Sequence, residues 1–120
     1  MFCYQCQETA GCTGCTRAGV CGKSARTAAL QDLLVYVTRG LCQLTTALRN
    51  QGEAIIPEDD RLVTENLFVT ITNANFDDDA LQARIRATLE RNAALRSRLD
   101  GAGLSAAARW DGSGDWEEKA

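Results

Sequence analysis

The sequence contains no histidine, and this absence removes a large part of enzyme chemistry from its 120 residues. Without an imidazole, the chain has no histidine general acid or base, no Cys-His nucleophile pair and no mixed Cys/His zinc site. Any chemistry carried by these residues must therefore run through cysteine sulfur.

Charge and hydropathy exclude two further classes of protein. The chain has 13 Lys and Arg against 16 Asp and Glu, which gives a net charge of −3. That balance offers no basic surface for nucleic acid. No apolar run reaches the length that crosses a bilayer, so we expect no membrane partner either.

The start of the chain points to a reducing compartment. Met1 and Phe2 lead directly into Cys3, without the basic region and apolar core of a signal peptide. We therefore expect a cytoplasmic location. In such a compartment, clustered cysteines serve as metal ligands more often than as disulfides.

The spacing of apolar residues and glycines predicts a mainly α fold with a Cys-rich loop, suited to bind a metal ion or a cluster, at one end of a three-helix bundle. Residues 1–23 are expected to be the loop, and residues 24–100 the bundle, which makes one domain with it. Helices joined by short connectors are expected to pack as antiparallel neighbours. Residues 101–120 are expected to be a linker and the start of a truncated helix, "DWEEKA", capped by Asp115. A helix that starts there and ends at once indicates either a fragment of a larger protein or a frayed tail.

The first helix is predicted from Ser24, its N-cap, to about Gln51, with Gly52 as its stop. Apolar residues recur at spacings of three and four along it and form one stripe. These residues are Leu30, Leu34, Val37, Leu41, Leu44 and Leu48.

Residues 58–75 are predicted to form the second helix, which Pro57 opens. The β-branched run Val69–Thr72 leaves a strand as the alternative. The third helix is predicted from an N-cap at Asp77 or Asp78 to about Leu99, ended by Asp100 and Gly101. The acidic run at residues 77–79 is expected to be a capping cluster rather than a site for divalent cations.

Five cysteines, Cys3, Cys6, Cys12, Cys15 and Cys21, fall within the first 21 residues. Two Cys-x-x-Cys knuckles would make a zinc ribbon, although the five residues between them are a short spacer. A set that omits Cys12 has wider gaps, which suit a polynuclear cluster. Disulfides are opposed by the odd number and the compartment. Spacing alone leaves zinc and iron–sulfur open, because thiolate sites serve both.

Several blocks of sequence, in order, are similar to one known family. They are "MFCYQCQETA", "GCT", "GVCGK", "LQDLLVYVTRG" and "LFVTITNANFDDD", with "WDGSGDWEEKA" as a looser match. Together they resemble the N-terminal end of the hybrid cluster proteins, also called prismane proteins or hydroxylamine reductases. The resemblance covers roughly residues 1–100.

The resemblance implies a ligand set. In the branch of the family with short gaps, the N-terminal cysteines bind a [4Fe-4S] cluster, and another branch carries a [2Fe-2S] cluster. The gaps of two, eight and five residues here match the short-gap branch. Carried over by position, the iron ligands are Cys3, Cys6, Cys15 and Cys21. Cys12 falls where the family pattern has no ligand.

The resemblance also implies a parent enzyme, an oxidoreductase that converts hydroxylamine to ammonia and water. Its chemistry takes place at a separate hybrid iron–sulfur–oxygen cluster, whose ligands these residues do not supply. The expected role of this chain is therefore electron entry. Its implied partners are an unknown electron donor protein and the remaining domains of the parent, and we expect the isolated chain to be inactive.

Other residues have simpler expected roles. Cys42 is expected to be a small buried hydrophobe in the first helix. Arg17 and Lys23 flank the ligands and are expected to be solvated loop charges. Phe2 and Tyr4 are expected to shield the cluster from water. The two tryptophans of the tail would either anchor it onto other parts of a larger protein or be exposed.

Two other functions compete with this one. The chain would be a zinc-stabilised helical binding module with no redox role, or a free-standing iron–sulfur electron carrier. Metal content separates the first from the cluster hypothesis. The apolar surface that three helices would leave exposed argues against the second.

Overall fold

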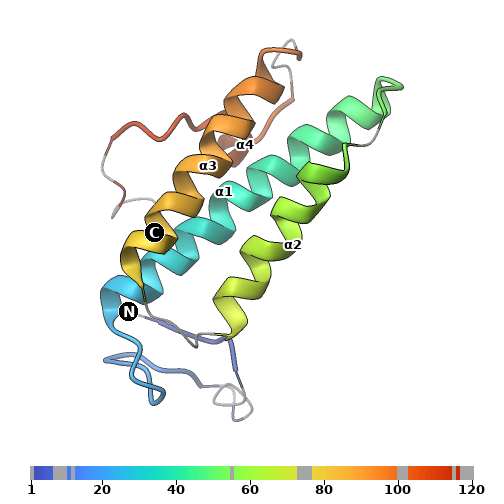
Figure 1. Cartoon of the computed structure of the whole chain (residues 1–120). Coiled ribbons are helices and arrows are strands. Elements are labelled where there is room, and N and C mark those ends of the chain that lie inside the picture. Colours follow the sequence, from blue (N-terminus) through green and yellow to red (C-terminus); the bar gives the residue numbers. More distant parts are fainter. Residues whose placement is uncertain are drawn as a thin grey trace.

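Residues 2–6, 11, 13–54, 56–72, 77–99, 103–114 and 116 are described by the computed structural model of the chain. They form three long helices and one short helix: α1 (Ala25–Asn50), α2 (Pro57–Thr72), α3 (Asp78–Arg96) and α4 (Ala106–Arg109). Helices α1 and α3 run in the same direction, and α2 runs in the opposite direction (Figure 1). The described ranges contain an isolated bridge but no strand, so the predicted mainly α bundle is confirmed.

Helix α1 begins where the sequence predicts it. Ser24 is the N-cap, and its hydroxyl oxygen accepts a hydrogen bond from the Thr27 backbone N–H at 3.1 Å. Gln51 caps the other end, and Gly52 follows with a φ of +86°. Every residue of the predicted apolar stripe is buried. Helix α1 contacts all three other helices, so this stripe is the centre of the fold.

Helix α2 includes Val69–Thr72, so the helical prediction for this segment is confirmed and the strand alternative is wrong. Pro57 occupies the first helical position, and three acidic residues fill the first turn, where they interact favourably with the helix dipole. Thr70 is buried, and its hydroxyl donates to the Leu67 carbonyl oxygen at 2.8 Å. Packing therefore outweighs the strand propensity of the β-branched run.

Helix α3 is capped by Asp77, whose carboxylate accepts from the Ala80 backbone N–H at 3.2 Å. This confirms the predicted capping role of the acidic run. The helix ends at Arg96, before the predicted end at Leu99. The predicted stop at residues 100–101 lies outside the described residues.

Two apolar clusters fill the bundle. The cluster nearer the N-terminal loop consists of Leu30, Leu33, Leu34, Val37, Leu81, Ile85, Leu89 and Trp110. The second cluster consists of Leu41, Leu44, Leu48, Leu95, Leu104 and Ala108. Both clusters join α1 to α3 and to the segment around α4, so these elements are held together by apolar contacts along much of the length of α1.

A buried polar cluster links the three long helices. Asn66 of α2 is fully buried, and its side-chain amide donates to the hydroxyls of Thr38 at 3.2 Å and Thr88 at 2.9 Å. Arg84 donates to the Asn66 side-chain oxygen at 3.3 Å. Because an unsatisfied buried amide is costly, these bonds favour one alignment of α2 against α1 and α3.

The segment after α3 differs from the expected linker. Helix α4 packs directly on α1, where Gly40 faces the Ala107 backbone so closely that any side chain at residue 40 would collide with the Ala107 carbonyl oxygen. Leu104 and Ala108 are buried in the second cluster. The small residues of α4 and Gly40 of α1 therefore permit the close packing of these two helices.

The two tryptophans pack within this chain, so the expectation that they are exposed is wrong, and an anchoring role onto other parts of a larger protein stays a prediction. Trp110 is buried, and its ring meets those of Tyr36 and Trp116 edge-on, with centroids 5.9 and 6.4 Å apart. The Arg86 guanidinium lies 5.5 Å from the centre of the Trp116 ring. The predicted cap at Asp115 and residues 117–120 lie outside the described residues.

Candidate metal centre

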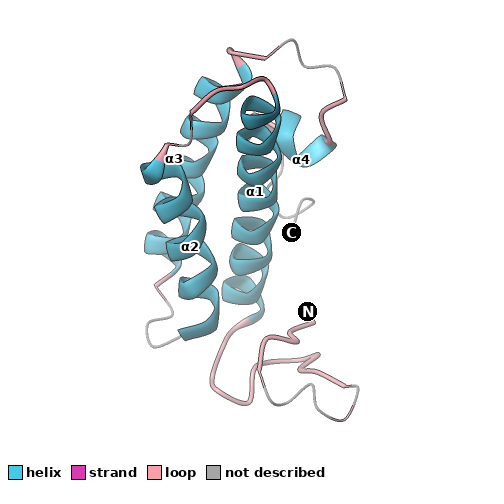
Figure 2. Ribbon diagram, turned by 90° about the vertical axis from the view of Figure 1, so that its right-hand side faces the viewer, coloured by secondary structure: helices cyan, strands magenta, loops and turns pink. Residues whose placement is uncertain are grey.

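The Cys-rich loop lies beyond one end of the bundle, below the first turn of α1 (Figure 2). The same end holds the N-terminus of α3. There the Thr27 hydroxyl donates to the Asp78 carboxylate at 2.6 Å, and Arg26 forms an ion pair with Asp78 at 3.4 Å. These contacts hold the first turns of α1 and α3 together, so the Cys-rich loop is attached to a well-packed end of the bundle.

Backbone pairing brings two of the predicted ligands together. The Cys3 N–H donates to the Cys15 carbonyl oxygen at 2.9 Å, and the Cys15 N–H donates to the Cys3 carbonyl oxygen at 3.0 Å. This exchange is an isolated antiparallel bridge. It aligns the first and third predicted ligands, although eleven residues separate them in the sequence.

A tight turn over residues 19–23 contains the fourth predicted ligand, Cys21. The Gly19 N–H donates to the Lys23 carbonyl oxygen at 2.7 Å, and the Gly22 N–H donates to the Gly19 carbonyl oxygen at 2.9 Å. A Cβ at residue 19 would lie 2.8 Å from the Lys23 Cβ and 3.2 Å from the Cys21 Sγ. Glycine at this position thus lets the turn close over Cys21 and Lys23.

Lys23 is buried, with 1% of its surface exposed, so the expectation that it is a solvated loop charge is wrong. Its ammonium donates to the Cys3 Sγ at 3.3 Å. Burying an ammonium ion is costly unless an anion compensates it. The contact to Cys3 supplies that anion when Cys3 is a thiolate, which is the form of cysteine that binds metals. Arg17, by contrast, is exposed as expected.

Sequence reasoning missed Lys23 because its position in a glycine-rich loop indicates exposure. The sequence contains one weak signal that Lys23 differs from the other cations. Arginine fills 11 of the 13 cationic positions, so lysine is the exception in this chain. The carboxyl group of Asp32, on α1, also senses the Lys23 charge: burial raises the pKa of Asp32, and Lys23 partly opposes that rise.

The four predicted ligands differ in exposure. Cys3 and Cys15 are half-buried, whereas Cys6 and Cys21 are exposed. Cys12 lies outside the described residues. Cys3, Cys15 and Cys21 are free thiols and form no disulfide. Within the described ranges, no three acidic or cysteine side chains converge closely enough to hold a metal ion.

The donor set nevertheless suits an iron–sulfur cluster. Such clusters are held by cysteine thiolates, and their properties depend on hydrogen bonds and charges near the sulfurs. The loop offers thiols, glycine-rich backbone and a buried ammonium in contact with one sulfur. A buried cation at the predicted ligand Cys3 is the local feature that fits an anionic cluster best.

Cys42 is exposed on α1, so the prediction that it is a buried hydrophobe is wrong. It faces a hollow between α1 and α2, together with Arg49, Asp60 and Val63. Partial burial of the sulfur raises the pKa of the Cys42 thiol, Arg49 opposes this rise and Asp60 adds to it. A thiol with a raised pKa is a poor nucleophile at neutral pH.

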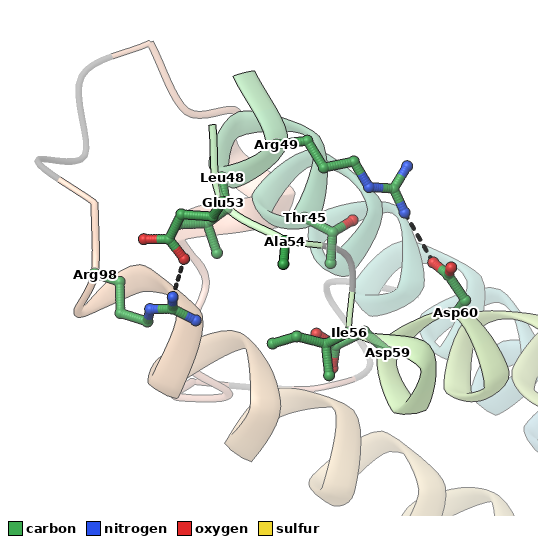
Figure 3. A pocket seen from close by; sticks show the side chains of 9 residues that line it. All are labelled: Thr45, Leu48, Arg49, Glu53, Ala54, Ile56, Asp59, Asp60 and Arg98. Atoms are coloured by element: carbon green, nitrogen blue, oxygen red, sulfur yellow. Dashed lines mark hydrogen bonds and ion pairs between the residues drawn. The ribbon is translucent and has the colours of Figure 1, made fainter. Parts of the chain in front are cut away.

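A small pocket lies at the end of the bundle away from the Cys-rich loop (Figure 3). Its volume of about 20 Å³ is room for one water molecule. Arg49 pairs with Asp60 at 2.9 Å, and Arg98 pairs with Glu53. These ion pairs join chain segments at the ends of the helices, so we interpret the residues around the pocket as structural contacts.

None of the described helices is both long enough and apolar enough to cross a membrane.

Comparison with known proteins identifies relatives of this chain. The family model described as Prismane/CO dehydrogenase family matches residues 1–116. A hydroxylamine reductase of Desulfovibrio desulfuricans is 60% identical over 114 residues, which cover 94% of this chain and 21% of that protein. A hydroxylamine reductase of Bacteroides thetaiotaomicron is 47% identical, over 100% of this chain and 22% of that protein.

A third relative, a hydroxylamine reductase of Clostridium perfringens, is 48% identical over 86% of this chain and 19% of that protein. The chain thus spans about a fifth of the length of the curated relatives it matches.

Proposed function

The chain belongs to the Prismane/CO dehydrogenase family, and from that premise we propose that it is the N-terminal, cluster-binding part of a hydroxylamine reductase. The observation that carries this proposal is the match to relatives of that name over nearly the whole chain, at up to 60% identity. The buried Lys23 side chain at Cys3 supports it independently, because a cation beside a predicted ligand sulfur would offset the negative charge of a bound cluster.

The proposed iron ligands are Cys3, Cys6, Cys15 and Cys21, and the proposed cofactor is a [4Fe-4S] cluster. The backbone bridge aligns Cys3 with Cys15, and the Gly19 turn holds Cys21 beside Lys23. When bound, such a cluster supplies one-electron transfer. The chain's own residues hold the ligands, set the charge around them and limit the access of water.

Phe2 and Tyr4 are the proposed shield on one side of the ligands. Their rings stack with centroids 5.4 Å apart, and both remain about half exposed. The Phe2 ring also lies beside Gly14, which precedes Cys15. The pair therefore lies on the Cys3–Cys15 side of the loop, where it would limit the access of water to a bound cluster.

The proposed parent reaction consumes two electrons and two protons: the N–O bond of hydroxylamine breaks, and ammonia and water form. A low-potential one-electron donor protein would supply the electrons one at a time. The bond cleavage would take place in other domains of the parent, where the proposed hybrid iron–sulfur–oxygen cluster would supply the redox chemistry. We place the parent in the cytoplasm, where thiols stay reduced.

Metal analysis of the chain purified without oxygen tests this function. About four irons and four sulfides per chain, with a broad visible band that dithionite bleaches, are expected for the cubane cluster. Two irons would place the chain in the other branch of the family. One zinc without iron or colour would overturn the redox role and favour a binding module.

Activity measurements separate the chain from its parent. With its cluster reduced by dithionite, the isolated chain is expected not to consume hydroxylamine faster than a metal-free sample does. Faster turnover would show that the chain carries the chemistry itself and would contradict the electron-entry role.

A further inference from the structure

Lys23 combines two properties that a lysine in a loop seldom has. Its surface is 1% exposed, and its ammonium makes its hydrogen bond to a sulfur, the Cys3 Sγ, at 3.3 Å. This hydrogen bond links the buried charge to a predicted ligand, and the Asp32 carboxyl on α1 interacts electrostatically with the same charge. A charge in such a place is fixed in position and poorly screened by salt.

The surrounding backbone holds Lys23 in this position. Its carbonyl oxygen accepts the Gly19 N–H at 2.7 Å, and its side chain packs where any larger residue at position 19 would collide with it. The next residue, Ser24, is the N-cap of α1. Lys23 is therefore tied to the first turn of the bundle on one side and to the sulfur of Cys3 on the other.

Building on the proposed function, we propose that Lys23 is a positioning residue that fixes one positive charge at the Cys3 ligand and thereby raises the reduction potential of the cluster. Reduction transfers one electron from a low-potential donor to the cluster and makes it more negative, with no bond formed or broken. A fixed cation beside a ligand sulfur stabilises that more negative state. A hydrogen bond to the same sulfur acts in the same direction.

Arg17 provides a matched comparison within the same loop. It carries the same charge and lies between the predicted ligands Cys15 and Cys21, but it is exposed. Water and salt screen an exposed charge, so Arg17 is expected to change the potential little, and only at low ionic strength.

The test is potentiometry on the chain with its cluster, for the wild type and the variants Lys23→Met, Lys23→Arg and Arg17→Met. At a fixed ambient potential, Lys23→Met is expected to lower the ratio of reduced to oxidised cluster at least about tenfold, a shift of about 59 mV for a one-electron couple. Lys23→Arg is expected to restore most of the ratio, and Arg17→Met to change it less than about twofold.

The outcomes separate charge from packing. If Lys23→Met loses its cluster but Lys23→Arg keeps one with a potential close to that of the wild type, the charge is needed at the ligand and the proposal stands, whereas a Lys23→Arg cluster with a potential lowered by about 59 mV or more overturns it. If Lys23→Met keeps a cluster of unchanged potential, or if both Lys23 variants lose the cluster, Lys23 is a packing residue and the proposal fails. A wild-type chain that binds no iron would overturn the proposed function instead, and this inference with it.

Discussion

The two ends of this molecule are held together by different forces. In the bundle, α1 is lined by leucines that are completely or almost completely buried against α3 and the segment around α4. In the Cys-rich loop, Phe2, Tyr4 and Val20 are exposed, and the chain is held by backbone pairs and by one buried lysine. The bundle can rely on apolar burial, whereas the loop has very little of it.

The free energies of these two kinds of interaction also differ in size. Burial of one leucine side chain contributes roughly 1.5–3 kcal/mol, whereas one backbone hydrogen bond contributes a net of about 1 kcal/mol. The loop therefore depends on whatever binds its thiols, because metal binding and loop ordering are coupled. The bundle is expected to fold without the metal. The comparison suggests three experiments, in order of expected effect.

Removal of a ligand should disable the loop and spare the bundle. In Cys15→Ser, the iron content is expected to fall below about a tenth of the wild-type value, because one of four thiolates is lost. The far-UV circular dichroism should stay close to that of the wild type, since the helices do not depend on the cluster. Iron analysis and dichroism measure the two effects on one sample.

Cys12→Ser is the matched control for that substitution. It changes a neighbouring thiol in the same loop and is expected to leave the iron content unchanged. If Cys12→Ser loses the iron and Cys15→Ser keeps it, the ligand set is Cys3, Cys6, Cys12 and Cys21 instead.

Removal of a core leucine should destabilise the bundle and leave the iron content of the loop unchanged. Leu41 is fully buried at the centre of α1, so Leu41→Ala is expected to lower the free energy of unfolding by about 3 kcal/mol in urea titrations. The iron content per folded chain should not change. Leu67→Ala makes the same change at an exposed position of α2 and should cost less than about 1 kcal/mol. Equal losses from both variants would contradict the assignment of the core.

The smallest expected effect is a change in the alkylation rate of Cys42, the thiol that lies outside the Cys-rich loop. Since partial burial raises the pKa of the Cys42 thiol, less thiolate is present at neutral pH than in the unfolded chain. Iodoacetamide should therefore alkylate Cys42 more slowly in the native chain than in urea at the same pH. The native rate should keep increasing to higher pH than the rate in urea does. Peptide mapping by mass spectrometry follows this one residue, and equal rates in the two states would contradict the raised pKa.

Local signals in the sequence predicted much of the bundle. Ser24 and Asp77 cap their helices as their side chains and positions indicate, because N-capping needs only a hydrogen bond to a backbone N–H a few residues away. The apolar stripe of α1 is buried throughout because its period matches the helix. For α2, the same local signals are compatible with either a helix or a strand, and contacts with α1 and α3 favour the helix.

Errors occurred where burial depends on segments distant in the sequence. The segment around α4 has the composition of a linker, but Gly40 leaves room for it on α1. Cys42 was expected inside and lies outside, because the faces of α1 that α2 and α3 cover cannot be read from α1 alone. Lys23 was expected outside and lies inside, because the turn at Gly19 folds back over it.

The sequence by itself determined the helices and their caps, the chemistry available to sulfur in a chain without histidine, and the resemblance that predicts the four ligands. Those properties depend on residue types at short spacings, which the order of residues contains directly. Only the tertiary structure decided that Cys3 meets Cys15, that α4 covers Gly40 and that Lys23 is buried against a ligand sulfur. Each of these is a contact between distant segments, and it exists only once packing and loop closure have brought the segments together.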